Sequence, residues 1–93
     1  MRVEMVRMIV FVSGEWIQVD LPSYLDPSWS ESDRVLYATA LAKARAMGDP
    51  RPSIVAEAIV TIARYPSTSY DSSLMDRILA VRDGDFKGRV GKA

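Results

Sequence analysis

The chain has 93 residues, enough for one domain with a single buried core, and we take residues 1–93 as that domain. Twelve basic side chains balance twelve acidic ones, so no overall charge attracts nucleic acid or an anionic membrane. Because the sequence contains neither cysteine nor histidine, it excludes disulfides, thiol nucleophiles, histidine-based acid–base catalysis and zinc sites built on these residues.

Charged residues interrupt the apolar N-terminus. Glu4 and Arg7 fall within the run MRVEMVRMIVFV, and no small-residue cleavage site follows it, so we expect no signal peptide. No apolar segment has the length of a membrane span. Arginine is more frequent than lysine and alanine is abundant, a composition typical of GC-rich genomes. We therefore expect a cytoplasmic protein of bacterial or phage origin that does not associate with membranes.

Two segments rich in β-branched and aromatic residues predict a β-hairpin over about residues 3–21. Residues 3–12 and 16–21 form its strands, with Ser13–Gly14 as the tight turn. A turn at Gly14–Glu15 is the alternative, but it would place Phe11 against Gln18 and Ile9 against Asp20. The preferred register gives one aliphatic face (Val6, Met8, Val10, Ile17, Val19 and Leu21) and one face of cross-strand pairs (Phe11 with Trp16, Ile9 with Gln18, and Arg7 with Asp20).

Prolines mark a linker over residues 22–30, because Pro22 and Pro27 prevent the strand from continuing and a helix from starting early. Ser30 and Asp33 resemble a capping box that opens a helix over residues 31–47, which Gly48 ends. Helical periodicity places one set of residues on the packed face of this helix: Leu36, Tyr37, Ala40, Leu41, Ala44 and Met47.

Two further helices are predicted, over residues 53–65 and 71–83. The helix over 53–65 is apolar around most of its circumference, so it is either central to the core or shared with a partner chain. We expect residues 85–93 to form a mobile tail. In the helix over 71–83 the residues predicted to face inward are Leu74, Met75, Ile78, Leu79 and Val81. Because a two-stranded ribbon is unstable alone, we expect an α+β fold in which the N-terminal hairpin packs on a three-helix C-terminal part.

The acidic residues show no spacing that indicates catalysis. The sequence Asp83–Gly84–Asp85 lacks the alternating ligands of a calcium loop, and no glycine-rich phosphate loop is present. Ser72 and Ser73 have no visible base that would activate them as nucleophiles. We therefore predict a protein that is not an enzyme and has no cofactor, catalytic residue or metal site.

A degenerate helix-turn-helix around residues 43–64 is the alternative function, because Ala44, Gly48 and Ile54 have the spacing of that motif. Residues 43–93 carry nine basic and six acidic side chains, which also favours DNA binding. Against it, Pro50 and Pro52 stand where the recognition helix would start. The candidate nucleic-acid contacts are Lys43, Arg45 and Arg51, with Lys87, Arg89 and Lys92 from the basic tail.

The preferred function is protein binding through the hairpin. If the helices cover its aliphatic face, the candidate partner-binding residues Ile9, Phe11, Trp16 and Gln18 remain on the outer side. The competing interpretation is that residues 22–29 fold back over them, or that Phe11 and Trp16 only stack on each other. We predict a small adaptor, regulator or inhibitor that binds another protein, and a homodimer through the hairpin is one form of this.

Overall fold

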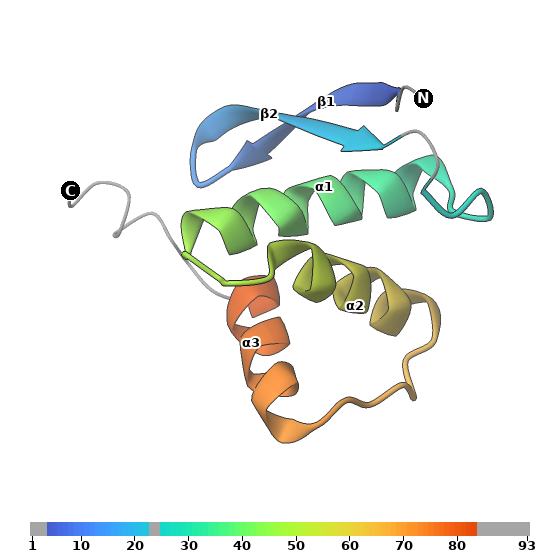
Figure 1. The fold of residues 1–93 in the computed structure, drawn as a ribbon, viewed down its shortest axis with the longest axis vertical. Helices are drawn as coiled ribbons and strands as arrows, with labels where there is room; N and C mark the ends of the chain where they lie inside the picture. Colours follow the sequence, from blue (N-terminus) through green and yellow to red (C-terminus); the bar gives the residue numbers. More distant parts are fainter. Residues whose placement is uncertain (1–3, 23–24, 84–93) are drawn as a thin grey trace.

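A computed structural model describes residues 4–22 and 25–83 of the chain. The elements follow the order β1 (Met5–Val12), β2 (Glu15–Pro22), α1 (Glu31–Ala46), α2 (Pro52–Arg64) and α3 (Ser72–Asp83), as shown in Figure 1. A two-stranded antiparallel hairpin followed by three helices is the predicted α+β fold, and the predicted helix boundaries differ by one residue or less. The predicted tail over 85–93 lies outside the described residues.

The hairpin has the predicted register. Phe11 pairs with Trp16, Ile9 with Gln18, and the strands turn at Ser13 and Gly14. Both turn residues have positive φ, 53° and 82°, as the tightest hairpin turns require. The alternative turn at Gly14–Glu15 is therefore excluded.

The elements lie in layers, with α1 between the hairpin and α2 (Figure 1). The inner face of the hairpin packs on α1 through four buried residues, namely Val10, Val12, Val19 and Leu21. Val6 was predicted on this aliphatic face but is 50% exposed. Strand twist explains the difference, because it lifts the start of β1 away from α1.

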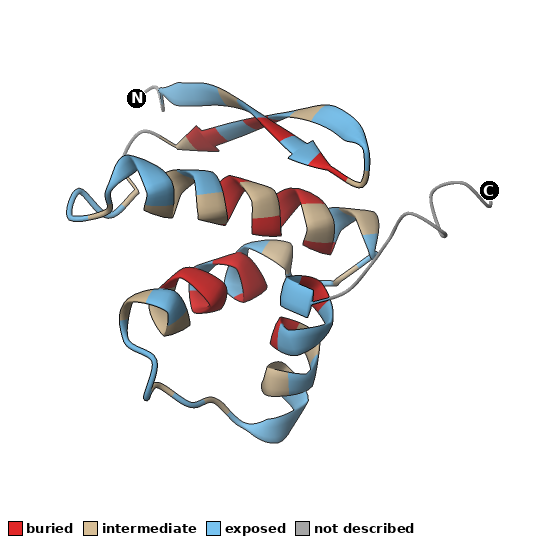
Figure 2. Ribbon diagram, turned by 180° about the vertical axis from the view of Figure 1, so that it is seen from behind, coloured by how far each residue is buried: buried red, intermediate tan, exposed pale blue. Residues whose placement is uncertain are grey.

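Helix α1 begins at the predicted capping box. The Ser30 hydroxyl accepts a hydrogen bond from the Asp33 backbone amide, and the Asp33 carboxylate accepts one from the Ser30 amide. Ala38 and Ala42 are buried although they lie outside the predicted face, whereas Met47 is exposed. The buried arc is wider than predicted because α1 packs against the hairpin on one side and α2 on the other (Figure 2).

Helix α2 is buried largely within its own chain. Of the two alternatives for this apolar helix, the structure therefore shows the first, a place in the core of its own chain. The core residues of α2 are Val55, Ala56, Ala58, Ile59 and Val60. Helix α3 contributes only Ile78 and Val81 as fully buried residues, with Leu74 and Met75 partly buried. Leu79, predicted to face inward, is 39% exposed because α3 packs along a narrow stripe of its surface.

An ion pair ties α3 to the turn between α1 and α2. The Asp49 carboxylate accepts hydrogen bonds from Arg77 Nη2 at 2.6 Å and Nε at 3.0 Å, and from the Arg51 backbone amide at 2.8 Å. The Asp49 side chain is 6% exposed. The hydrogen bonds from Arg77 lower the pKa of Asp49 below its ordinary value, against the opposing effect of burial.

This pair predicts a pH-dependent contribution to stability. Because the pKa of Asp49 is lower in the folded chain, its contribution is complete above the ordinary pKa of 3.8 and is lost as the pH falls through the lowered value. Asp49→Asn should lower the free energy of unfolding by about 1–3 kcal/mol at pH 7. Urea unfolding of both proteins at pH 7 and pH 2.5 should show that the difference shrinks in acid. An equal difference at both pH values would contradict a role for the Asp49 charge.

Candidate functional site

Helix α1 lies on one side of the hairpin, and the other side carries the outer face (Figure 2). We define the outer face by Ile9, Phe11, Trp16 and Gln18, together with the pair Arg7 and Asp20. Side chains alternate across a strand, so burial of Val10 and Val19 on one face leaves their neighbours on the other. Ile9, Phe11 and Trp16 are 62%, 55% and 72% exposed. Large apolar side chains exposed next to one another are typical of binding surfaces.

The aromatic pair at the turn end is held in place. The rings of Phe11 and Trp16 lie with their centroids 4.9 Å apart at an interplanar angle of 58°. Tilted aromatic pairs of this kind contribute about 0.5–1.5 kcal/mol beyond the area that they bury. The Ser13–Gly14 turn fixes the register that brings the two rings together. The two rings therefore form a preorganised apolar surface, and preorganisation lowers the entropy cost of binding.

Farther from the turn, the outer face carries a charged pair, Arg7 and Asp20. Arg7 Nε donates to Asp20 Oδ1 at 3.4 Å, and both side chains are well exposed. An exposed pair of this kind adds little to stability. The outer face thus changes from aromatic at the turn, through Ile9 and Gln18, to one positive and one negative charge.

The described part of the linker does not cover the outer face. Residues 25–29 lie at the end of the hairpin away from its turn, near the start of α1 (Figure 1). Trp29 stacks on Tyr37 with ring centroids 5.3 Å apart, and Leu25 packs against the core. For these linker residues, the interpretation that they fold back over Phe11 and Trp16 is wrong.

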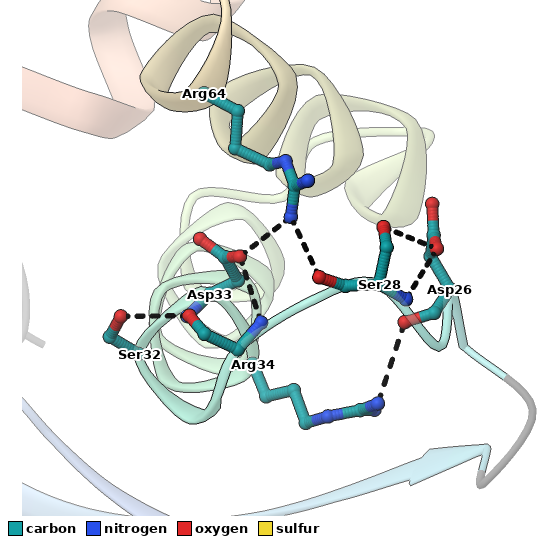
Figure 3. A network of polar contacts seen from close by, with 7 residues as sticks. Asp26, Ser28, Ser32, Asp33, Arg34 and Arg64 are labelled. Carbon is teal, nitrogen blue, oxygen red and sulfur yellow. Dashed lines mark hydrogen bonds and ion pairs between the residues drawn. The ribbon is translucent and has the colours of Figure 1, made fainter.

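A polar network keeps the linker in this position (Figure 3). Arg64 Nη1 donates to Asp33 Oδ2 at 2.8 Å and to the Ser28 backbone carbonyl at 3.2 Å, which joins the end of α2 to the linker and to α1. Within the linker, Asp26 Oδ1 accepts from the Ser28 amide and hydroxyl, and these bonds lower the pKa of Asp26. Arg34 donates to the Asp26 carbonyl at 3.4 Å. The network anchors the linker on the helices.

Sequence reasoning missed a groove between the three helices. The main hollow has a volume of about 420 Å³ and is lined by Leu36, Ile59, Ile62, Ala63, Pro66, Ile78 and Arg82. A hollow of about 200 Å³ beside it shares Leu36, Ile59 and Arg82. Lys43 donates to the Arg82 backbone carbonyl at 3.2 Å along its side. The residues that line the groove come from separate helices, so no local sequence pattern could reveal the groove.

Only some of the residues that were predicted to contact nucleic acid lie in the described part of the chain. Arg45 and Arg51 are exposed at the end of α1 and just before α2, whereas Lys87, Arg89 and Lys92 lie outside the described residues. The exposed part of the would-be recognition helix offers Ser53, Ile54 and Glu57. A carboxylate in this position repels phosphate, so this surface is poorly suited to DNA.

Within residues 4–22 and 25–83, no group of three or more His, Cys, Asp or Glu side chains could hold a metal ion. None of the helices in the same ranges is long and apolar enough to cross a lipid bilayer. Comparison with protein-family models, curated proteins and solved structures finds no match to this chain. Any argument about function therefore depends on the surface itself.

Proposed function

We propose that the protein acts by binding another protein through the outer face of its hairpin, as a cytoplasmic, non-enzymatic adaptor, regulator or inhibitor of bacterial or phage origin. The observation that carries this proposal is the exposure of Ile9, Phe11 and Trp16 side by side on a strand pair whose reverse face is in the core. Tryptophan is among the residues that most often dominate binding energies.

Two properties of the outer face support binding rather than packing. First, the residues that stabilise the hairpin, such as Val19 and Leu21, lie on the other side, so the exposed side chains are not needed to hold the fold. Second, the Phe11–Trp16 pair is preformed by the backbone register. An apolar surface that is rigid and dispensable for folding is suited to a partner.

Trp16→Ala should abolish or strongly weaken partner binding while the fold remains intact. A hot-spot tryptophan contributes about 2 kcal/mol or more, which corresponds to a loss of about 30-fold or more in affinity. Because Trp16 is exposed and its main contact is the Phe11 ring, the free energy of unfolding should fall by no more than about 1.5 kcal/mol. The partner is identified by affinity capture from the native cell, purified, and titrated against both proteins by calorimetry.

Ile54→Ala is the control, because Ile54 is an exposed large apolar residue of α2, and α2 is separated from the hairpin by α1. It should bind the purified partner as the wild type does. Equal affinity of Trp16→Ala and wild type would contradict the proposed function. So would a large loss of stability in Trp16→Ala with binding intact, because the aromatic pair would then be structural.

A further inference from the structure

We infer that the partner of the outer face is a second copy of this chain, which packs face to face on it as a symmetric dimer. This inference rests on the proposed function and names the occupant of the same surface. It is carried by the order of side chains along the hairpin. Counted from the turn, the first three cross-strand rows of the outer face are Phe11 with Trp16, Ile9 with Gln18, and Arg7 with Asp20, and the pair Met5 with Pro22 follows them.

A two-fold axis that runs along the strands, midway between two facing hairpins, places each row on the same row of the second copy with its members exchanged. Phe11 then lies over Trp16 of the second copy, and Trp16 over its Phe11. Likewise Arg7 faces Asp20 of the second copy, and Asp20 faces its Arg7. Aromatic side chains thus meet aromatic ones and each charge meets its opposite, so the outer face is complementary to itself.

The other simple arrangement lacks this match. With the two-fold axis across the strands at Ile9 and Gln18, the charged row of each copy would lie on the aromatic row of the other. Arg7 and Asp20 would then lose hydration without gaining new partners of opposite charge. The axis along the strands is therefore favoured.

The fold leaves room for this dimer, because all three helices lie on the opposite side of the hairpin (Figure 1). The net charge of the chain is zero, so two copies do not repel each other overall. An interface made of one short hairpin per copy is at the small end of specific interfaces, below about 1,200 Å² in total. We therefore expect association in the micromolar range rather than an obligate dimer.

Charge exchange tests the row pairing directly. In sedimentation equilibrium, the full-length wild type should move from its monomer mass of 10.4 kDa toward twice that mass as its concentration rises. Arg7→Asp should weaken self-association at least about tenfold, because two carboxylates would face each other across the axis, and Asp20→Arg should do the same with two cations. An equimolar mixture of the two variants should regain the wild-type affinity, because opposite charges then meet at both positions of the Arg7–Asp20 row. The doubly exchanged chain, Arg7→Asp with Asp20→Arg, should regain it alone.

The control pair, Arg45→Asp and Glu57→Arg, makes the same changes in net charge at exposed positions on α1 and α2. Each control variant should self-associate as the wild type does. Circular dichroism of every variant checks that the hairpin and helices are retained. Rescue in the exchanged mixture that exceeds any gain in the control mixture supports the dimer.

Two results would overturn this dimer. A wild type that stays at the monomer mass at every concentration shows that no dimer forms. Folded Arg7→Asp and Asp20→Arg variants that self-associate as the wild type does show that the copies meet elsewhere. The proposed function is judged separately: if a different purified protein binds the monomeric wild type and not Trp16→Ala, the outer face is a binding surface for that protein and the dimer alone is wrong.

Discussion

Leu21→Ala is expected to lower the free energy of unfolding by about 2–5 kcal/mol, the range for large-to-small changes in a packed core. Leu21 is the largest of the fully buried side chains and lies on the inner face of β2, in the layer between the hairpin and α1. Its loss removes apolar contacts from the surface that holds the hairpin on the helices. Chemical unfolding followed by circular dichroism measures the change.

Ile9→Ala is the matched control, because Ile9 is an aliphatic residue of the same hairpin on its outer face. Its truncation should change the free energy of unfolding by less than about 1 kcal/mol. The contrast separates the face that stabilises the fold from the face that is free to bind. Both variants are compared at a concentration below the micromolar range, where the chain is monomeric. Comparable losses there would mean that the rest of the chain covers the outer face.

Ile78→Ala should be as damaging, with an expected loss of about 2–5 kcal/mol. Helix α3 is held mainly by Ile78 and Val81, and by the hydrogen bonds of Arg77 to Asp49. With so few anchors, α3 should be released before the other helices when Ile78 is shortened. Hydrogen exchange should then show a greater loss of protection for α3 than for α1.

Leu79→Ala is the neighbouring control for this change, because Leu79 is partly exposed on the same helix. Its effect on the free energy of unfolding should stay below about 1 kcal/mol, and α3 should keep its protection. If Leu79→Ala released α3 as Ile78→Ala does, the predicted inward position of Leu79 would be right and the packing of α3 described above would be wrong.

The hairpin and its register could be predicted from the sequence, because strand periodicity and turn chemistry are both local. The Ser13–Gly14 turn and the alternation of aliphatic with other residues point to the same pairing, so the pairing of Phe11 with Trp16 followed. The ends of α1 were also predicted, since its capping box and Gly48 lie next to the helix in the sequence.

The rest depends on contacts that no local pattern contains. Burial of Ala38 and Ala42 requires that α1 has neighbours on two sides, whereas periodicity indicates only one. Arg64 donates to the Ser28 backbone carbonyl, 36 positions away, which holds the linker at a distance from the aromatic pair. Exposure of the candidate site therefore could not be predicted, because it depends on where a proline-containing linker lies.

Side chains of the hairpin alternate between the inner and the outer face, and this alternation affects how the outer face can change during evolution. Inward and outward positions are interleaved along the same strands, so a substitution at Ile9 or Gln18 leaves the neighbouring core contacts of Val10 and Val19 in place. Selection can thus alter the outer face without first finding a compensating change in the core. The same property makes the outward positions a practical set for a randomised library in which most members still fold.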